Sequence, residues 1–279
     1  MPITASTQMA ARIDRAELAL MLGIAEAVRQ AKAPIQVWPV GGSFAVLGEP
    51  GSPFNKVIAL GFDGEPAVDE LETIERGHAA AGVRVQVELS TLANPEVARA
   101  LTVRGYQLIG FENVLGRRLA DVTGVPDGAI TVSEIEPHQS AEWIRVLIDA
   151  FSHPDVFDGP PSHESFDNSE LERAYQSFAA VPGVVRLLAS IDGAVAGGGS
   201  LYLHDKVAML CGAGTVPASR RRGVQSALLS ARLAEARAKG CDLAVVTTQP
   251  GSKSQENVQR AGFELLYSRA VLVKPLNAP

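Results

Sequence analysis

The chain has 279 residues, of which 46% are apolar and 20% are charged, and its formal net charge is −6. This composition predicts a packed globular protein and excludes a disordered chain, and the length favours two domains over one. Apart from one triple arginine, no run of Lys or Arg is long enough to follow a phosphate backbone, so nucleic acid is not an expected partner.

The two cysteines give no sign of a metal site or a disulfide. Cys211 and Cys241 each lie in an apolar stretch, without a CxxC spacing and without a histidine at ligand distance. We interpret them as buried reduced thiols, as expected in a cytoplasmic protein. Residues 1–32 are predicted to form an amphipathic helix, and no stretch has the ~18 uninterrupted apolar residues of a membrane span. No membrane contact is expected.

The first part of the sequence predicts alternating helices and strands. After the first helix come strands at 35–46 and 56–61, a helix at 66–81, a strand at 84–89, a helix at 95–103 and a strand at 106–119. Gly124, Pro126 and Gly128 then mark a surface connector. We therefore expect an N-terminal α/β unit at 1–122 and a second domain at 129–279.

The second part predicts a longer series of elements. These are a strand at 129–135, a helix at 141–151, a polar loop at 152–168, a helix at 169–178, strands at 184–191, 194–203 and 206–216, a helix at 222–239, a strand at 243–248, a helix at 254–261 and a closing strand at 263–273. Asp192-Gly193 is a dipeptide that two-residue hairpin turns prefer, so the strands on either side of it are expected to pair antiparallel.

A segment of the first half recurs in the second half. The strand, short helix, glycine–aromatic turn and strand of 85–119 resemble those of 243–276. Duplication of one α/β unit would explain the match, and chance similarity of two short pieces is the alternative. The aligned pairs are Gly105-Tyr106 with Gly262-Phe263, Val114-Leu115 with Val271-Leu272, and Leu119 with Leu276.

The triple arginine stands where a predicted strand meets a predicted long helix. The first N–H groups of a helix lack intrahelical acceptors and carry partial positive charge, so a pyrophosphate can bind there. Gly223 has no Cβ and permits close approach of the anion, and Arg220, Arg221 and Arg222 add favourable charge. A solvated basic turn is the alternative interpretation.

At this point the sequence resembles the GNAT superfamily of N-acetyltransferases. The signature of that superfamily is Gln or Arg, two residues, Gly, one residue, then Gly or Ala, after Val-x-Pro at a strand end. The stretch Arg220-Arg221-Arg222-Gly223-Val224-Gln225 meets it except at the last position, where Gln225 replaces a small residue. The element order of 129–276 is also similar to that of the superfamily.

The resemblance implies an α/β (α+β) GNAT fold with a mixed, mostly antiparallel sheet whose strands at 206–216 and 243–248 splay apart around acetyl-CoA. It implies that the pantetheine arm pairs with the backbone of Thr215 and Val216. The pyrophosphate is then expected on the loop and helix start. Its implied contacts are Arg220, Arg221, Arg222, Gly223, Val224, Gln225 and Ser226.

The first half lacks such a loop. Its corresponding stretch, 62–67 (Phe-Asp-Gly-Glu-Pro-Ala), leads into a helix with acids and no arginine, so it would repel a pyrophosphate. We interpret this half as a related, smaller, degenerate and non-catalytic unit. It could pack against the catalytic unit, cover part of the acceptor cleft or mediate homodimerisation, and the sequence does not choose among these roles.

The catalytic groups are unknown at this level. Many members of the superfamily carry a Tyr four residues before the glycine–aromatic turn, where this chain has Val258, and the strand position of a Glu base in some members falls in the apolar run 209–211. Ser254 and Asn257 are candidate coenzyme A contacts, with helix capping by Ser254 and a solvated Asn257 as the alternative.

The polar loop at 152–168 carries several acids and histidines but no regular ligand spacing, so no metal is predicted. In the superfamily this segment borders the acceptor pocket, and an acidic rim could attract a protonated amine. The residues concerned are His153, Asp155, Asp158, His163, Glu164 and Asp167.

The resemblance predicts transfer of an acetyl or short acyl group from acetyl-CoA directly to a primary amine of a small molecule or peptide. An acyl-CoA-binding regulatory module without turnover is the second hypothesis, because both familiar catalytic groups are missing. A nucleotide site is disfavoured, since neither GxGxxG after a strand nor GxxxxGK[ST] occurs.

Overall fold

A single sheet of eleven strands runs through the whole molecule in a computed structural model that describes residues 3–122, 130–153 and 166–276. The strand order is β1-β2-β3-β4-β11-β5-β10-β9-β8-β7-β6. Eight of the ten neighbouring pairs are antiparallel and the pairs β3–β4 and β9–β10 are parallel. The predicted mixed, mostly antiparallel sheet is confirmed.

The elements before the predicted connector agree closely with the sequence pattern. They are α1 (Thr7–Gln30), β1 (Gln36–Val40), β2 (Ser43–Leu47), β3 (Val57–Ile58), α2 (Val68–Ala80), β4 (Val85–Ser90), α3 (Pro95–Val103), β5 (Gln107–Arg118) and the short helix η1 (Leu119–Asp121). The predicted strand at 56–61 is reduced to two residues, because β3 pairs with β4 only at Val57 and Val87. The predicted connector at 121–128 lies mostly outside the described residues.

The second part also follows the predicted order. Its elements are β6 (Ile130–Glu134), η2 (Pro137–Gln139), α4 (Ser140–Ser152), α5 (Asn168–Ala179), β7 (Val184–Ile191), β8 (Ala194–His204), β9 (Val207–Thr215), η3 (Pro217–Ser219), α6 (Val224–Ala238), β10 (Leu243–Thr248), α7 (Lys253–Arg260) and β11 (Glu264–Lys274). The predicted antiparallel hairpin at Asp192-Gly193 is confirmed by the pairing of β7 with β8. The helix predicted from 222 begins at Val224, because Gly223 takes a left-handed N-cap conformation.

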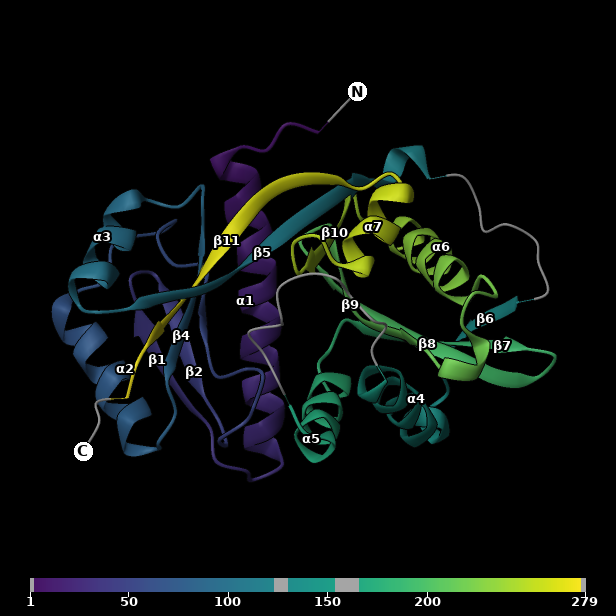
Figure 1. Cartoon of the computed structure of the whole chain (residues 1–279), viewed down its shortest axis with the longest axis horizontal. Coiled ribbons are helices and arrows are strands. Elements are labelled where there is room, and N and C mark those ends of the chain that lie inside the picture. Colours follow the sequence, from purple (N-terminus) through teal and green to yellow (C-terminus); the bar gives the residue numbers. More distant parts are fainter. Residues whose placement is uncertain (1–2, 123–129, 154–165, 277–279) are drawn as a thin grey trace.

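The two halves exchange strands at the centre of the sheet (Figure 1). β5 comes from the first half but lies between β11 and β10, and β11 comes from the end of the chain but lies between β4 and β5. The pair Gly116–Glu264 at one end of the β5–β11 ladder corresponds, under the internal repeat, to the pair Val273–Gln107 at the other end. The repeated segments are therefore related by an approximate two-fold axis between β5 and β11. The division at 122/129 remains a proposal about units of sequence, and the hydrogen bonding crosses it.

Helices cover both faces of the sheet. α1, α4 and α5 share one apolar cluster with β9, β10 and β11, in which Ile13, Trp143 and Val245 are buried. On the other face, α6 and α7 pack Leu228 and Val258 against β9 and β10, while α2 and α3 cover β4. Along β9 the residues alternate between these two clusters, as strand geometry requires. No helix in the described part of the chain is long and apolar enough to cross a membrane.

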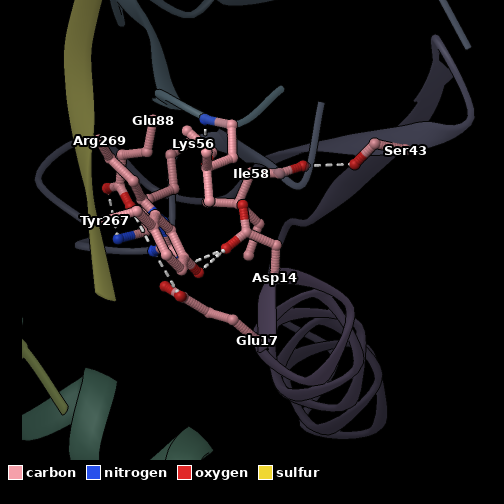
Figure 2. A network of polar contacts seen from close by, with 10 residues as sticks. Asp14, Glu17, Ser43, Lys56, Ile58, Glu88, Tyr267 and Arg269 are labelled. Atoms are coloured by element: carbon pink, nitrogen blue, oxygen red, sulfur yellow. Dashed lines mark hydrogen bonds and ion pairs between the residues drawn. The ribbon is translucent and has the colours of Figure 1, made fainter. Parts of the chain in front are cut away.

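A buried ionic network fixes α1 to the exchanged strand β11 (Figure 2). Arg269 on β11 donates from Nη2 to Asp14 Oδ1 at 2.6 Å and from Nη1 to Glu17 Oε2 at 2.6 Å, both on α1. Tyr267 donates its hydroxyl to Asp14 Oδ1 at 2.6 Å. On the other side of Arg269, Glu88 of β4 lies 3.6 Å from Nη1 and accepts a hydrogen bond from Lys56. The C-terminal strand is thus bound through charges to the N-terminal half.

Candidate functional site

The parallel strands β9 and β10 pair at one end only. Their register covers Leu243–Val207, Ala244–Ala208 and Val245–Met209 and then stops, although both strands continue. The residues of β9 up to Leu210 are buried, whereas those from Cys211 to Val216 are partly exposed. The sheet therefore opens between β9 and β10, as predicted for these two strands.

Unpaired backbone groups line the β9 side of this opening. Val216 donates its N–H to Ala196 at 3.0 Å, so its N–H faces β8, and its carbonyl accepts from Ser219 at 2.9 Å. Because antiparallel pairs alternate, Thr215 and Ala213 turn their N–H and C=O groups away from β8 and toward the opening. Of the two predicted pantetheine contacts, only Thr215 presents both backbone groups to the opening, and Ala213, which was not predicted, presents the same groups.

β9 carries a bulge deeper in the opening. The register shifts from Gly199–Ala213 to Ser200–Cys211, which leaves Gly212 unpaired with a φ of +35°. Ser200 secures the bulge by donating its hydroxyl to the carbonyl of Cys211 at 2.7 Å. Glycine suits this position because the backbone there is left-handed.

The loop after β9 leaves a row of amide groups open. Gly223 is the N-cap of α6 with φ +87°, and it has no side chain to cap the helix. The backbone N–H groups from Arg221 to Ser226 donate to no acceptor among the described residues. Open amides at a helix N-terminus form an anion-binding site, so this loop fits the pyrophosphate predicted there. Val224 is buried under the loop, while Gln225 and Ser226 are exposed.

The three arginines divide into two roles. Arg220 turns back to α4, donating from Nη2 to the carbonyl of Ala150 at 3.3 Å and to that of His153. It therefore satisfies carbonyls at the C-terminal end of α4. Arg221, with φ +59°, and Arg222 are exposed beside the open amides. These two are the arginines whose side chains are available to a phosphate.

α7 contacts the start of α6. Asn257 donates from Nδ2 to Oε1 of Gln225 at 2.8 Å, so the residue that departs from the GNAT signature links the two helices. Ser254 is exposed on α7. The cap of this helix is Ser252, which accepts from the N–H of Gln255 at 3.2 Å, and the alternative capping role for Ser254 is therefore wrong.

The corresponding loop of the first half is closed by its own acids. Glu70 Oε2 accepts from the N–H of Ala67 at 2.9 Å and from that of Gly41 at 3.0 Å. Asp63 in the same loop is bound by Arg15 of α1, and this contact holds the pKa of Asp63 below its ordinary value. Carboxylates thus take up amide groups and a cation around this loop, and the degenerate role of this half stays a prediction.

Catalytic groups are scarce around the opening. Val258 of α7 is buried in the apolar cluster formed with α6 and the sheet, so α7 offers no hydroxyl at that position. Asp167 caps α5 by accepting from the N–H of Glu170 at 2.8 Å, and His153 contacts the carbonyl of Asp149. The other residues of the predicted acidic rim, Asp155, Asp158, His163 and Glu164, lie outside the described residues. Among the described residues no cluster could hold a metal ion.

Three polar side chains do approach the bulge. Burial raises the pKa of the Cys211 thiol to about 12, which favours the protonated thiol. Arg232 of α6 lies beneath the sheet and is bound only to carbonyls, and burial lowers its pKa to about 10. Tyr175 of α5 faces Gly212 from the opposite side. Sequence reasoning missed Tyr175 and Arg232, since helical periodicity does not reveal which strand a helix faces.

Comparisons with known proteins agree with this geometry. Residues 145–263 match the model of the "Acetyltransferase (GNAT) family". A GCN5-related N-acetyltransferase from Kribbella flavida is 20% identical in sequence, with a TM-score of 0.65 and coverage of 96% of each chain. A tandem GNAT protein from the clavulanic acid biosynthesis pathway is 12% identical, with a TM-score of 0.63 and coverage of 100% of this chain and 98% of that one. No curated protein matches the sequence.

The structural likenesses extend over the whole chain. At 20% and 12% identity these likenesses show the fold alone. They cover the N-terminal half of the chain as well as residues 145–263. The predicted GNAT fold with a related unit in front of it is therefore confirmed.

Proposed function

Given an acetyltransferase domain of the GNAT family at residues 145–263, we propose that the protein transfers an acetyl or short acyl group from acetyl-CoA to a primary amine of a small molecule or peptide. The observation that carries this proposal is the continuity between the open amides of 221–226 and the unpaired edge of β9. The open amides suit a pyrophosphate, and the unpaired strand edge suits an extended chain that contains amide groups. Acetyl-CoA contains a pyrophosphate followed by such a chain, the pantetheine arm.

The pantetheine arm completes the unpaired strand. Its amide groups pair with the backbone of Ala213 and Thr215, as an added strand would, while the pyrophosphate accepts from the amides of the loop. Gly212 lies four positions before Val216, which is roughly 13 Å along a strand. An extended arm that starts at the loop therefore brings its thioester to the bulge of β9.

The reaction is direct transfer. The amine nitrogen attacks the thioester carbonyl, the carbon–sulfur bond breaks and the thiol leaves. The raised pKa of the Cys211 thiol disfavours a thiolate nucleophile, so we propose no acyl-enzyme intermediate on Cys211. The alternative is a regulatory module that binds acetyl-CoA without turnover. It is supported by Val258, which is buried and stands where many members of the superfamily carry a tyrosine hydroxyl. This alternative predicts binding of acetyl-CoA without release of thiol.

Binding is tested by thermal unfolding with and without acetyl-CoA. Gly223→Glu places a carboxylate in the pyrophosphate loop, and Gly240→Glu is its matched control. Gly223 and Gly240 flank the two ends of α6 with φ of +87° and +80°, and a Cβ on Gly240 would meet nothing within 4 Å. Both variants pay the cost of a left-handed side-chain residue, but only the first adds charge to the loop.

Saturating acetyl-CoA is expected to raise the Tm of the wild type and of Gly240→Glu by about 5 °C or more, and not that of Gly223→Glu. A free-thiol assay with a panel of primary amines then tests transfer. Equal Tm shifts in all three proteins would contradict the proposed loop, and a shift without thiol release would favour the regulatory module.

A further inference from the structure

We propose that the hydroxyl of Tyr175 on α5 donates the proton that the departing thiolate takes up, in place of the side chain that α7 lacks. This inference rests on the proposed function, because it assigns a catalytic residue to that reaction. It starts from the bulge of β9, where the arm of acetyl-CoA brings the thioester.

The aromatic ring of Tyr175 extends from α5 to the bulge of β9. A Cβ built on Gly212 would lie 3.2 Å from Cε1 and 3.3 Å from the hydroxyl oxygen of Tyr175. No larger residue could occupy position 212 without moving the tyrosine. The absence of a side chain at Gly212 therefore lets this hydroxyl lie against the residue of β9 that the bulge leaves unpaired with β8.

Packing fixes the ring in this orientation. Trp143 lies against it edge to face with centroids 5.5 Å apart, and Phe151 lies 6.3 Å away. Both belong to α4, whose end is bound by Arg220 of the phosphate loop. A chain of contacts thus connects the loop that binds the pyrophosphate with the ring that faces the bulge.

The hydroxyl of Tyr175, a partly buried residue, has no hydrogen-bond partner among the described residues, in contrast to Tyr267, whose hydroxyl donates to Asp14. Burial raises the pKa of Tyr175, and the nearby Cys211 adds to the shift, so the hydroxyl stays protonated. A protonated, unpartnered donor beside the bulge can serve a group that arrives there.

The proton balance closes within one turnover. The amine nitrogen forms a bond to the carbonyl carbon, the carbon–sulfur bond breaks, and its electron pair stays on sulfur. Sulfur takes the Tyr175 proton as this charge develops, and water carries the proton released by the new amide nitrogen back to the phenolate. The products are an amide and a free thiol.

The test compares two hydroxyl deletions in the full-length protein. Tyr175→Phe keeps the ring and its packing. Tyr202→Phe is the matched control, because Tyr202 is buried on the same face of the sheet but turns its ring toward Gly183. Each variant is measured by the Tm shift with acetyl-CoA, and by thiol release with acetyl-CoA and a panel of ethanolamine, spermidine, benzylamine and a lysine peptide.

Tyr175→Phe is expected to keep the Tm shift and the KM for acetyl-CoA within about threefold while kcat falls about 100-fold, and Tyr202→Phe to behave as the wild type. A wild-type kcat in Tyr175→Phe would overturn the proposal and leave the proposed function standing. A lost Tm shift in Tyr175→Phe would also overturn it, because the residue would then act in binding. Absence of thiol release by the wild type would overturn both.

Discussion

Arg269 and Asp14 form an ion pair of 2.6 Å between the last strand and the first helix, and both side chains are buried. The pair joins the two ends of the sequence across the exchanged strands. Burial raises the pKa of Asp14 despite the attraction of Arg269, which shows how much solvation each partner has lost. Arg269 is the cation that compensates the buried charge of Asp14.

Replacing Arg269 by Met should therefore destabilise the fold strongly. It leaves Asp14 and Glu88 buried without their shared cation, and removal of one partner from a buried pair costs about 3–5 kcal/mol. Arg99→Met is the control, because Arg99 forms an exposed pair with Glu96 on α3. Urea unfolding measures both. Equal unfolding midpoints for the two variants would show that the buried pair does not hold the halves together.

Glu112 gives the same network a dependence on pH. Its Oε2 is buried without a partner among the described residues, and burial together with the charge of Glu88 raises its pKa well above the ordinary 4.5. The folded state thus favours the protonated acid. Its contribution to stability is full below the unfolded pKa and declines as the pH rises toward the folded pKa.

Glu112→Gln should remove this decline. Between about pH 5 and pH 8 the wild type is expected to lose stability relative to the variant by up to about 1.4 kcal/mol per pH unit, over the part of that range below the folded pKa. Burial alone would raise the pKa of Glu88, but Lys56 and Arg269 bring it below its ordinary value, and this opposite contribution is common to both proteins. Denaturant unfolding at several pH values measures the difference. Parallel stability curves would mean that Glu112 is ionised in the folded protein.

The order of elements was predictable because it depends on local pattern. Apolar spacing, turn glycines and the repeat located nearly every helix and strand, and the phosphate loop combined a strand end, a helix start and a glycine within one short segment. Strand exchange was not predictable, since β5 and β11 would carry the same alternation whichever neighbours they had. Arg269 stands in an apolar run, and its partners on α1 are set only by the fold.

The arginines of the phosphate loop also have partners that the sequence does not reveal, and they give a third prediction. Arg220→Ala removes the donors to Ala150 and His153, so the Tm should fall by the equivalent of about 1.5–3 kcal/mol, as expected for a hydrogen bond to a charged group. Arg222→Ala removes no contact with any described residue, so the Tm should not change. Its effect should be an affinity for acetyl-CoA that is about 3- to 10-fold weaker, measured by calorimetric titration. A normal affinity in Arg222→Ala would exclude this side chain from the pyrophosphate site.

Arg232 provides the last prediction, because it is a buried cation without a carboxylate. It is 5% exposed, and among the residues that the structure describes it donates only to the carbonyls of Leu228 at 3.2 Å and Ser200 at 3.4 Å. Its charge lies beneath the bulge of β9, where the proposed reaction would develop negative charge on the thioester, and a fixed positive charge there would stabilise the transition state. Arg232→Met should therefore leave the Tm equal or higher, since no anion loses its partner, and lower kcat about 10-fold. Arg232→Lys keeps the charge and should lose less activity. A lower Tm with an unchanged kcat in Arg232→Met would instead assign Arg232 to support of the sheet.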